Sequence, residues 1–410
     1  MKGATMADAA GFRALYLHVP FCVRKCAYCD FASSATGRHD PLMAAYARSL
    51  AAMVRRMEGE GLLDGLSTAY VGGGTPSLLG AESLSSLIAA VPPVGELTFE
   101  ANPDSFSPDL AVSARDAGAT RVSLGVQSLV DEELACLGRI HDAASARAAV
   151  AEGAAAGLRV SADLMAAVPW QTPASLVASV GGVVAAGASH VSVYPLMIEE
   201  GTAFARAVDS GAMEEPTDDD GAAAMEAAEG ALARLGLSRY EVASYALPGE
   251  RCRHNLAYWD GTPYLGLGTA AASMADRETY RRLRSVAPAL PAVAPSTARM
   301  RLTCTSTARD VAEAYGDPSS LTFEVEELTA REAAAEDLML AARTSDGLGP
   351  DLLARSRDVI GAAAVDRTVG TLVGEGLLTP GADGGFAPTE RGWLMGNEVF
   401  GALWDLAGEG

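Results

Sequence analysis

Short apolar runs alternate with amphipathic segments along residues 14–246 of this 410-residue chain. Each run, rich in Val, Leu and Ala, predicts a strand, and the segment after it has apolar residues at helical spacing. This alternation is typical of β-α units repeated on a parallel sheet. Strands are predicted near 14–18, 68–71, 97–100, 121–125, 159–164 and 190–194, with helices including 41–57, 109–117 and 144–155.

The pattern changes after the sixth predicted strand. An Ala-rich helix over 218–235 precedes a seventh strand over 239–244, and residues 281–325 carry Pro, Ser and Thr without clear periodicity. Helical patterns return over 329–342, 350–355 and 362–375, and a hairpin with a Gly-rich turn follows over 377–389.

These elements predict an α/β protein, a partial parallel (β/α) barrel with a small C-terminal winged-helix-like α+β domain. The predicted divisions are a flexible N-terminus over 1–13, the barrel and its extension over 14–280, an irregular connection over 281–325 and the C-terminal domain over 326–410.

Composition narrows the class of partner. With 31 basic and 52 acidic residues the formal net charge is -21, so we expect no nucleic-acid partner. Six cysteines are too few for a disulfide framework and fit a reducing cytosol. Residues 1–13 lack the apolar core of a signal peptide, and no stretch has the length and apolarity of a membrane span. We therefore expect a soluble cytoplasmic protein.

Three cysteines, Cys22, Cys26 and Cys29, follow the first predicted strand at C-x3-C-x2-C spacing. Iron-sulfur clusters are held by cysteine thiolates, and a four-iron cluster with only three cysteines keeps one iron open for a non-protein ligand. Structural zinc is the alternative. Zinc would need a fourth ligand, for which His18 and His39 are the nearby histidines, and such sites usually draw ligands from two separated pairs. The spacing favours the cluster.

Polar or glycine residues also close the next predicted strands. Gly72-Gly73-Gly74-Thr75 follows the second strand, and Glu100, Gln127 and Asp163 stand at or near the ends of the third, fourth and fifth. Any one of these could be a buried structural residue. In β-α barrels, however, chemistry gathers at the carboxyl ends of the strands, so their joint occurrence predicts one ligand site facing the cysteines.

The stretches YLHVPFCVRKCAYCDF, VGGGTPSLL, FEANPDS, RVSLGVQS, LGRIH and YEVASYALPGERCRHNLAYW resemble the HemW haem chaperones. These are radical S-adenosylmethionine (SAM) proteins related to oxygen-independent coproporphyrinogen III oxidase. The resemblance implies a barrel of the radical SAM type and a 4Fe-4S cluster whose open iron is chelated by SAM. It implies SAM contacts from Tyr16, Tyr28, Gly73, Gly74, Thr75, Glu100, Gln127, Arg139, Asp163 and, as an apolar contact, Met197.

Two features resemble the chaperones rather than the oxidases. Phe31 stands where the oxidase loop has a fourth cysteine, and HNLAYW places His254 ahead of Tyr258 and Trp259. The residues alone favour a histidine hydrogen-bonded in a polar loop; with the resemblance, they favour His254 as an axial haem ligand beside an aromatic wall. Two residues depart from the family pattern. Ala167 stands where the family has the glycine of DLM-x-G-L-P, and Ala272 stands near the histidine that ends the family's G-x-G-x-G-A-H segment.

Two hypotheses follow. The first is a haem chaperone that holds a 4Fe-4S cluster, SAM and haem and delivers haem to an acceptor protein. The second is a radical SAM enzyme that decarboxylates a tetrapyrrole propionate oxidatively. Phe31 and HNLAYW favour the first, while the SAM contacts keep the second open. The expected partners are a tetrapyrrole, a haem-accepting protein and an electron donor such as flavodoxin or ferredoxin, with at most transient membrane contact.

Overall fold

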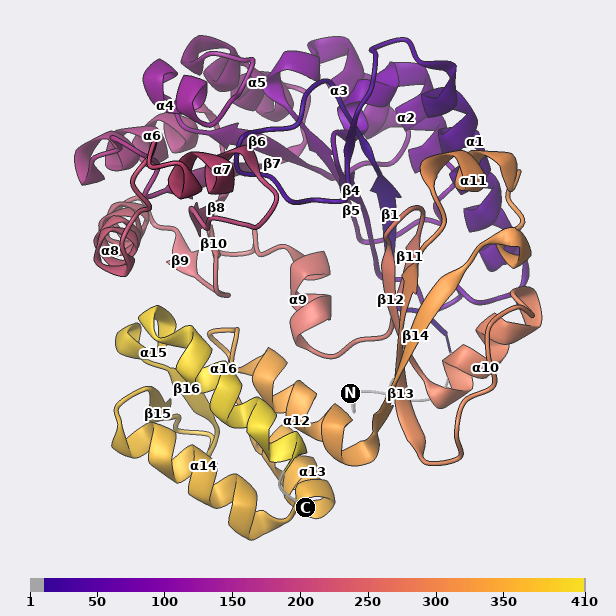
Figure 1. The fold of residues 1–410 in the computed structure, drawn as a ribbon, viewed down its shortest axis with the longest axis vertical. Coiled ribbons are helices and arrows are strands. Elements are labelled where there is room, and N and C mark those ends of the chain that lie inside the picture. Colours follow the sequence, from indigo (N-terminus) through magenta and orange to yellow (C-terminus); the bar gives the residue numbers. More distant parts are fainter. Residues whose placement is uncertain (1–10, 409–410) are drawn as a thin grey trace.

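A long, mostly parallel sheet organises residues 11–408, the part of the chain that the computed structural model describes (Figure 1). Its strands are β1 (Ala14–Val19), β4 (Thr68–Gly73), β5 (Glu96–Ala101), β6 (Arg121–Gln127), β7 (Arg159–Ala166), β8 (His190–Pro195), β9 (Ser238–Arg239), β10 (Ser244–Ala246), β11 (Tyr264–Leu267), β12 (Ala272–Asp276), β13 (Thr297–Cys304) and β14 (Phe323–Thr329). The spatial order is β14-β13-β12-β11-β1-β4-β5-β6-β7-β8-β10-β9. Two short pairs stand apart, β2 (Phe21–Cys22) with β3 (Ser34–Ala35) and β15 (Leu378–Pro380) with β16 (Phe386–Pro388).

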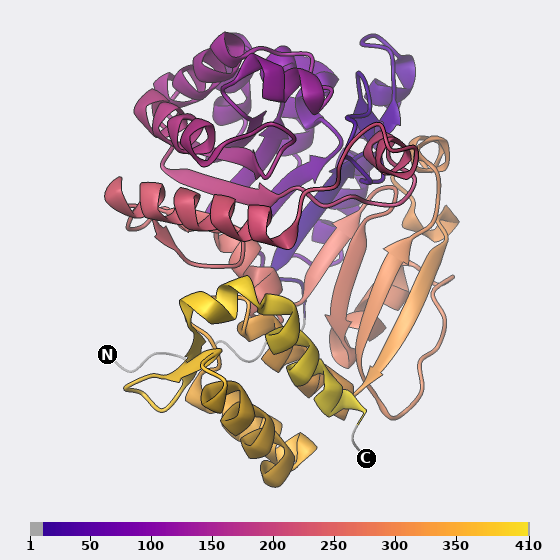
Figure 2. The same cartoon turned by 60° about the vertical axis from the view of Figure 1, so that its left-hand side comes forward.

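Helices cover the outer face of the parallel strands (Figures 1 and 2). Asp40, Ser107 and Thr172 accept backbone hydrogen bonds at the starts of α1, α3 and α6, where Pro is the first helical residue. The helices are α1 (Pro41–Gly59), α2 (Gly80–Ile88), α3 (Pro108–Asp116), α4 (Asp131–Cys136), α5 (Ala143–Ala155), α6 (Pro173–Ala186), α7 (Ala203–Asp209), α8 (Asp218–Arg234), α9 (Arg253–Trp259), α10 (Arg277–Val286), α11 (Ala308–Glu313), α12 (Ala330–Ala341), α13 (Pro350–Ile360), α14 (Ala362–Gly374), α15 (Glu390–Leu394) and α16 (Gly396–Trp404).

The strands β1, β4, β5, β6, β7 and β8 are parallel neighbours, which confirms the predicted α/β partial barrel. Successive side chains of a strand point to opposite faces. In β6, Val122, Leu124 and Val126 are fully buried in the main core, whereas Arg121 and Ser123 belong to the opposite, inner face. The strands β4, β5, β6, β7 and β8 each supply one set of residues for packing and another that lines a cavity.

Three sequence expectations need correction. The predicted strand over 239–244 is split into β9 and β10, which pair with each other antiparallel. The predicted irregular connection over 281–325 holds the end of α10, β13, α11 and the start of β14. Of these, β13 and β14 extend the main sheet antiparallel. Residues 1–10 of the predicted flexible N-terminus lie outside the described residues, but Phe12 is fully buried and donates its N–H to the Leu62 carbonyl.

The C-terminal part has its own hydrophobic cluster, from Ala335 to Leu406, built mainly from α12, α13, α14 and α16 with the β15–β16 hairpin at one end (Figure 2). The helices and the hairpin agree with the predicted winged-helix-like pattern; the division at residue 326 stays a prediction. No helix within residues 11–408 is both long enough and apolar enough to cross a membrane.

Candidate functional site

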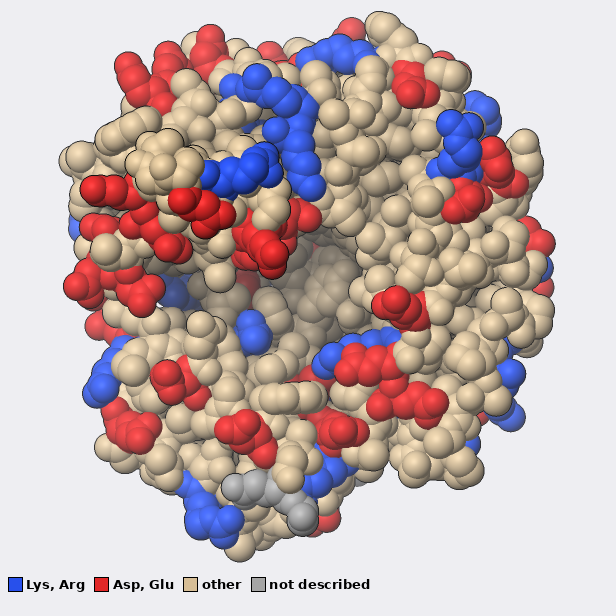
Figure 3. Space-filling model, in the orientation of Figure 1, with Lys and Arg blue, Asp and Glu red and all other residues tan. Residues whose placement is uncertain are grey.

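A cavity of about 360 Å³ opens at the inner face of the barrel, near the middle of the surface in Figure 3. Twelve of the fourteen predicted site residues line it. They are Cys22, Cys26, Tyr28, Cys29, Gly73, Gly74, Thr75, Glu100, Gln127, Arg139, Asp163 and Met197. The joint placement of strand-end residues and cysteines follows from the parallel topology, which brings the carboxyl ends of successive strands to one edge.

The three cysteines of the loop are free thiols in the same wall. Arg139 Nη1 lies 3.3 Å from Cys26 Sγ, and the Thr75 hydroxyl lies 3.5 Å from Cys22 Sγ. Burial raises the pKa of the Cys29 thiol, and the neighbouring Cys26 and Cys22 also raise it. Three thiols facing one cavity beside a cationic donor fit a cluster with three cysteine ligands.

The positions of the thiol groups still differ from those of a loaded site. Within residues 11–408, no group of three or more His, Cys, Asp or Glu side chains is arranged to hold a metal ion. The three thiols therefore have to turn toward one another to hold a cluster.

The glycine turn at the end of β4 brings its backbone close to the first strand and the cysteine loop. Gly73 has φ +115°, and a Cβ there would lie 2.6 Å from the His18 ring; a Cβ on Gly74 would lie 2.7 Å from the Phe21 carbonyl oxygen. Only glycine fits both approaches. The N–H of Gly73 donates to Glu100 Oε2 at 2.9 Å, so the turn and this carboxyl are held together.

Two buried carboxyls line the wall behind the turn. Glu100 also accepts from the Tyr70 hydroxyl at 2.8 Å, and Asp163 accepts from the Ser123 hydroxyl at 3.0 Å. Burial raises the pKa of Glu100 to about 7 and that of Asp163 to about 6. Both can therefore bind or lose a proton near neutral pH, when a ligand's cationic or hydroxyl group arrives.

Arg139 reaches the same wall from the loop after α4. Its Nη2 donates to Asn102 Oδ1 at 2.6 Å and to the Gly125 carbonyl at 2.8 Å. Asn102 in turn donates to the Thr75 hydroxyl at 2.9 Å. Gln127, at the end of β6, has the left-handed φ of +65°, an uncommon conformation for a residue with a side chain.

Met197 and Phe31 both line the cavity and are exposed, with Met197 65% exposed. Tyr16 and His254 are the two predicted residues that do not line the cavity. The Tyr16 ring stacks on Tyr70 at 6.2 Å between centroids, and its hydroxyl lies 3.1 Å from His18 Nδ1.

His254 lies behind Tyr70, in α9, and is 1% exposed. Its ring stacks on that of Tyr70 at 5.2 Å, its Nδ1 lies 3.1 Å from the Thr68 hydroxyl, and its Nε2 has no partner. Burial lowers the pKa of His254 to about 3, so the imidazole is neutral.

Sequence reasoning missed several wall residues, including Arg121, Ser123 and His190. The alternation of side chains along a strand could have identified two of them. Every second residue of β6, namely Arg121, Ser123, Gly125 and Gln127, lines the cavity. One departure also gains a physical meaning. Ala167 has φ +57°, so a residue with a side chain adopts the backbone conformation that suits the glycine of the family pattern.

Comparison with known proteins agrees with this geometry. Residues 16–180 match the Radical SAM superfamily. The heme chaperone HemW of Mycobacterium tuberculosis (strain CDC 1551 / Oshkosh) is 40% identical over 269 residues, 63% of this chain and 68% of the relative. The heme chaperone HemW of Bacillus subtilis is 28% identical over 399 residues, 95% of this chain and 99% of the relative.

Among solved structures, coproporphyrinogen III oxidase (HemN) from Escherichia coli, a radical SAM enzyme, superposes with a TM-score of 0.72 at 19% identity, covering 97% of this chain and 91% of that one. At this identity the likeness shows the fold alone. The superfamily match and the HemW identity carry the assignment further: this chain belongs to the HemW family of radical SAM proteins.

Proposed function

We propose that this protein is a haem chaperone that holds a 4Fe-4S cluster and SAM in the barrel cavity, binds haem and delivers it to an acceptor protein. The observation that carries the proposal is the single wall shared by the three cysteines, the glycine turn and the buried carboxyls of a HemW-family chain. All six cysteines are free thiols, which fits a protein working in the reducing cytoplasm.

Cys22, Cys26 and Cys29 would hold the cluster, and Arg139 beside Cys26 would offset part of its negative charge. When bound, the cluster supplies an open iron for SAM and a one-electron donor. The electron donor to it would be a flavodoxin or ferredoxin.

SAM would bind across the strand ends. The N–H groups and open space at Gly73 and Gly74, with Thr75, suit its methionine end, and the Arg139 guanidinium suits its carboxylate. Asp163 and Gln127 offer acceptors and donors for ribose hydroxyls, and Glu100 an acceptor for the amino group. Tyr16, Tyr28 and Met197 complete the set that the family resemblance implies.

Haem would take His254 as an axial ligand. In support, the imidazole is neutral and its Nε2 has no partner, so a ligating lone pair is available. The ring lies beneath α9, however, and α9 has to move away from β4 before iron can reach it.

A radical SAM enzyme acting on a tetrapyrrole is the second candidate. It is favoured by the two buried carboxyls and the glycine turn, because a haem carrier alone has no evident use for a SAM pocket.

One anaerobic experiment separates the two. Reconstituted protein is titrated with haem, and a parallel sample receives dithionite, SAM and coproporphyrinogen III. We expect a Soret band for the wild type, altered in His254→Ala, and no porphyrinogen product. Sustained turnover with SAM consumption would favour the enzyme instead, and haem binding that ignores His254 would remove that residue as the ligand.

A further inference from the structure

The end of the cavity farthest from the cysteine loop is a layer of polar side chains near the amino ends of the inner strands. This deep layer consists of Thr98 of β5, Arg121 of β6, Ser161 of β7 and His190 of β8, and all four line the cavity. Each is one inward step, two residues along its strand, from Glu100, Ser123, Asp163 or Ser192 of the wall above it. None of the four has a part in the SAM pocket proposed above.

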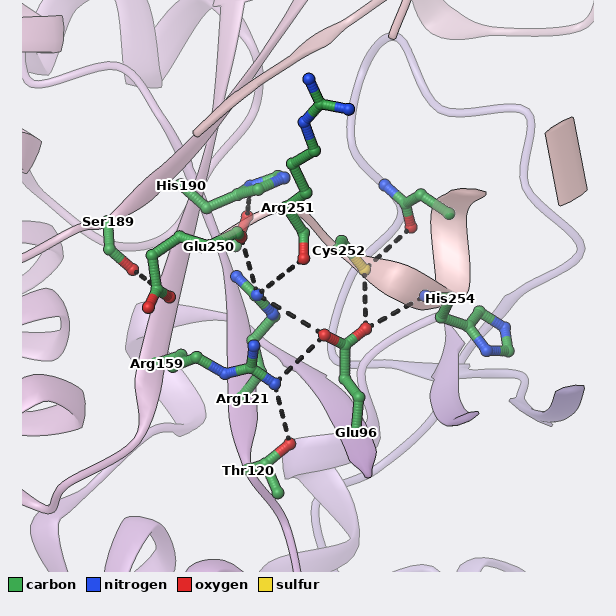
Figure 4. Close-up of polar contacts among 12 residues, drawn as sticks. Glu96, Thr120, Arg121, Arg159, Ser189, His190, Glu250, Arg251, Cys252 and His254 are labelled. Atoms are coloured by element: carbon green, nitrogen blue, oxygen red, sulfur yellow. Dashed lines mark hydrogen bonds and ion pairs between the residues drawn. The ribbon is translucent and has the colours of Figure 1, made fainter. Parts of the chain in front are cut away.

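Arg121 is the charged residue of the deep layer, and only one of its three side-chain nitrogens, Nη2, makes hydrogen bonds. Its side chain is 1% exposed, and its polar contacts are all made by Nη2, at 2.8 Å to the Glu250 carbonyl, 3.4 Å to the Arg251 carbonyl and 3.6 Å to Glu96 Oε2 (Figure 4). Nε and Nη1 are buried and have no partner. A buried guanidinium N–H without an acceptor is costly, so two such donors in a cavity wall call for an acceptor from outside the chain.

Thr98 adds a third polar atom of the same kind. It is the register partner of Arg121 across β5 and β6, and its hydroxyl is also buried without a partner. Ser161 and His190, by contrast, satisfy each other at 2.7 Å, and the other His190 nitrogen lies 2.9 Å from the Tyr240 hydroxyl. Within the deep layer, the side-chain donors without a partner therefore all belong to Thr98 and Arg121.

The charges around this pair do not cancel. Fully buried Glu96 lies 3.6 Å from Arg121 and 3.1 Å from Arg159, so two guanidinium groups share one carboxylate (Figure 4). Within residues 11–408, Glu96 is the one carboxylate at ion-pair distance from Arg121. Burial, with Arg121 and Arg159 nearby, lowers the pKa of His190 to about 3, and burial raises that of the Cys252 thiol to about 12, so both neighbours are neutral. The buried group formed by Glu96, Arg121 and Arg159 therefore has a net charge of +1.

From the surplus charge and the unmet donors we infer that the deep layer binds a carboxylate of the cavity's ligand, and that this carboxylate is a propionate of the tetrapyrrole. The Nε–H and Nη1–H groups of Arg121 can each donate a charge-assisted hydrogen bond to a carboxylate oxygen, and the Thr98 hydroxyl can donate a further one. The inference rests on the proposed function, since it assigns one end of the proposed cargo.

Esterified haem provides the test, because its methyl esters remove the propionate charges and keep the ring. The reconstituted full-length protein is titrated with haem and with haem dimethyl ester, followed at the Soret band. Arg121→Gln should weaken haem binding about tenfold or more and leave ester binding unchanged. The control is Arg159→Gln, which removes the other partner of Glu96 but lies outside the cavity wall and is 28% exposed. It should change neither affinity.

Thr98→Val serves as a second variant of nearly equal volume, and should weaken haem binding less than Arg121→Gln, again without affecting the ester. Thermal unfolding confirms that each variant is folded. Equal losses for haem and ester in Arg121→Gln would assign the residue a packing role and overturn the inference. So would unchanged haem binding, or a loss confined to SAM affinity, measured in parallel by calorimetry. If the wild type binds neither haem nor the ester, the chaperone proposal fails and the inference with it.

Discussion

Cys26 differs from the other cysteines because its sulfur lies beside the Arg139 guanidinium in the cavity wall. Cys26→Ala removes one of three proposed ligands, so the variant should lose the cluster after anaerobic reconstitution, as measured by iron and sulfide content. Cys136→Ala is the control, since Cys136 is a partly exposed thiol outside the wall and should be dispensable. Full iron loading in Cys26→Ala, or stoichiometric zinc in the wild type, would contradict the cluster assignment.

The buried carboxyl of Asp163 makes stability depend on pH. Burial raises its pKa to about 6 in the folded chain from an ordinary 3.8, so the folded state binds more protons between these values. Stability of the ligand-free chain should therefore fall as pH rises from about 4 to 6 and stay lower above that, by on the order of 1.4 kcal/mol per pKa unit. Asp163→Asn cannot ionise, so its gain in melting temperature over the wild type should be larger at pH 7.5 than at pH 4. A gain independent of pH would contradict the raised pKa.

Gly73 and Gly80 both have positive φ, but their surroundings differ. A Cβ at Gly73 would meet the His18 ring at 2.6 Å, while a Cβ at Gly80 meets nothing within 4 Å. Gly80→Ala should cost about 1–3 kcal/mol of unfolding free energy from backbone strain alone, because φ +77° with ψ 166° is a conformation adopted almost only by glycine, and Gly73→Ala at least about 1 kcal/mol more from overpacking. Urea unfolding of the two variants measures the difference; equal costs would show that the turn tolerates a side chain.

At this scale the sequence identified the residues with distinctive chemistry and missed those with ordinary chemistry. Cysteines, a glycine triplet and acids in apolar strands are conspicuous, and the structure brings them to one wall. Ser123 and Arg121 alternate with buried valines and leucines, so they look like the polar side of any half-exposed strand. The burial of His254 could not be predicted for a related reason: the motif gives its chemistry, but its burial depends on Thr68 and Tyr70, which are far away in sequence.

Among the elements, α9 connects the barrel to the C-terminal part. Near its start, His254 stacks on Tyr70 of β4; at its end, the Trp259 indole donates to Glu241 at 3.2 Å and lies under the Arg343 guanidinium, which also contacts the Phe400 ring. A short helix held at both ends can move only if contacts at one end are broken.

Haem ligation by His254 should therefore loosen α9. We expect amide hydrogen exchange over residues 253–259 to increase when haem binds, because the helix loses its contacts with β4. Peptides from α5, on the outer face of the barrel, should not change. Increased protection of α9, or no change while the Soret band forms, would show that iron is ligated elsewhere.

Element prediction succeeded where the repeat was regular. The six parallel strands and their helices have long periodic runs, and the structure contains all six. The elements that the sequence pattern did not reveal are short or follow proline-rich segments. β9 has two residues. β13 follows a Pro-rich stretch, which obscures the alternation of Met300, Leu302 and Cys304 on its buried face. Antiparallel extension of the sheet also depends on pairing between strands, which the period of one strand does not encode.

For the molecule as a whole, the net charge of -21 opposes an anionic cargo at long range. Acidic and basic side chains both stand around the hollow in Figure 3, and the surplus positive charge is buried at its far end. The association rate of haem should therefore rise with salt as repulsion is screened, over a Debye length of about 10 Å at 0.1 M. Stopped-flow mixing measures this, with haem dimethyl ester as the uncharged comparison. A rate that falls with salt would indicate a basic entry path instead.

The alternation of inner and outer residues along each barrel strand separates two kinds of evolutionary change. A replacement at an inward position alters what the cavity accepts and leaves untouched the buried residues on which the helices pack. A likeness to HemN of 0.72 in TM-score at 19% identity is compatible with such freedom. Inward replacements can therefore change what the cavity binds while the packing of the helices, and with it the fold, is kept.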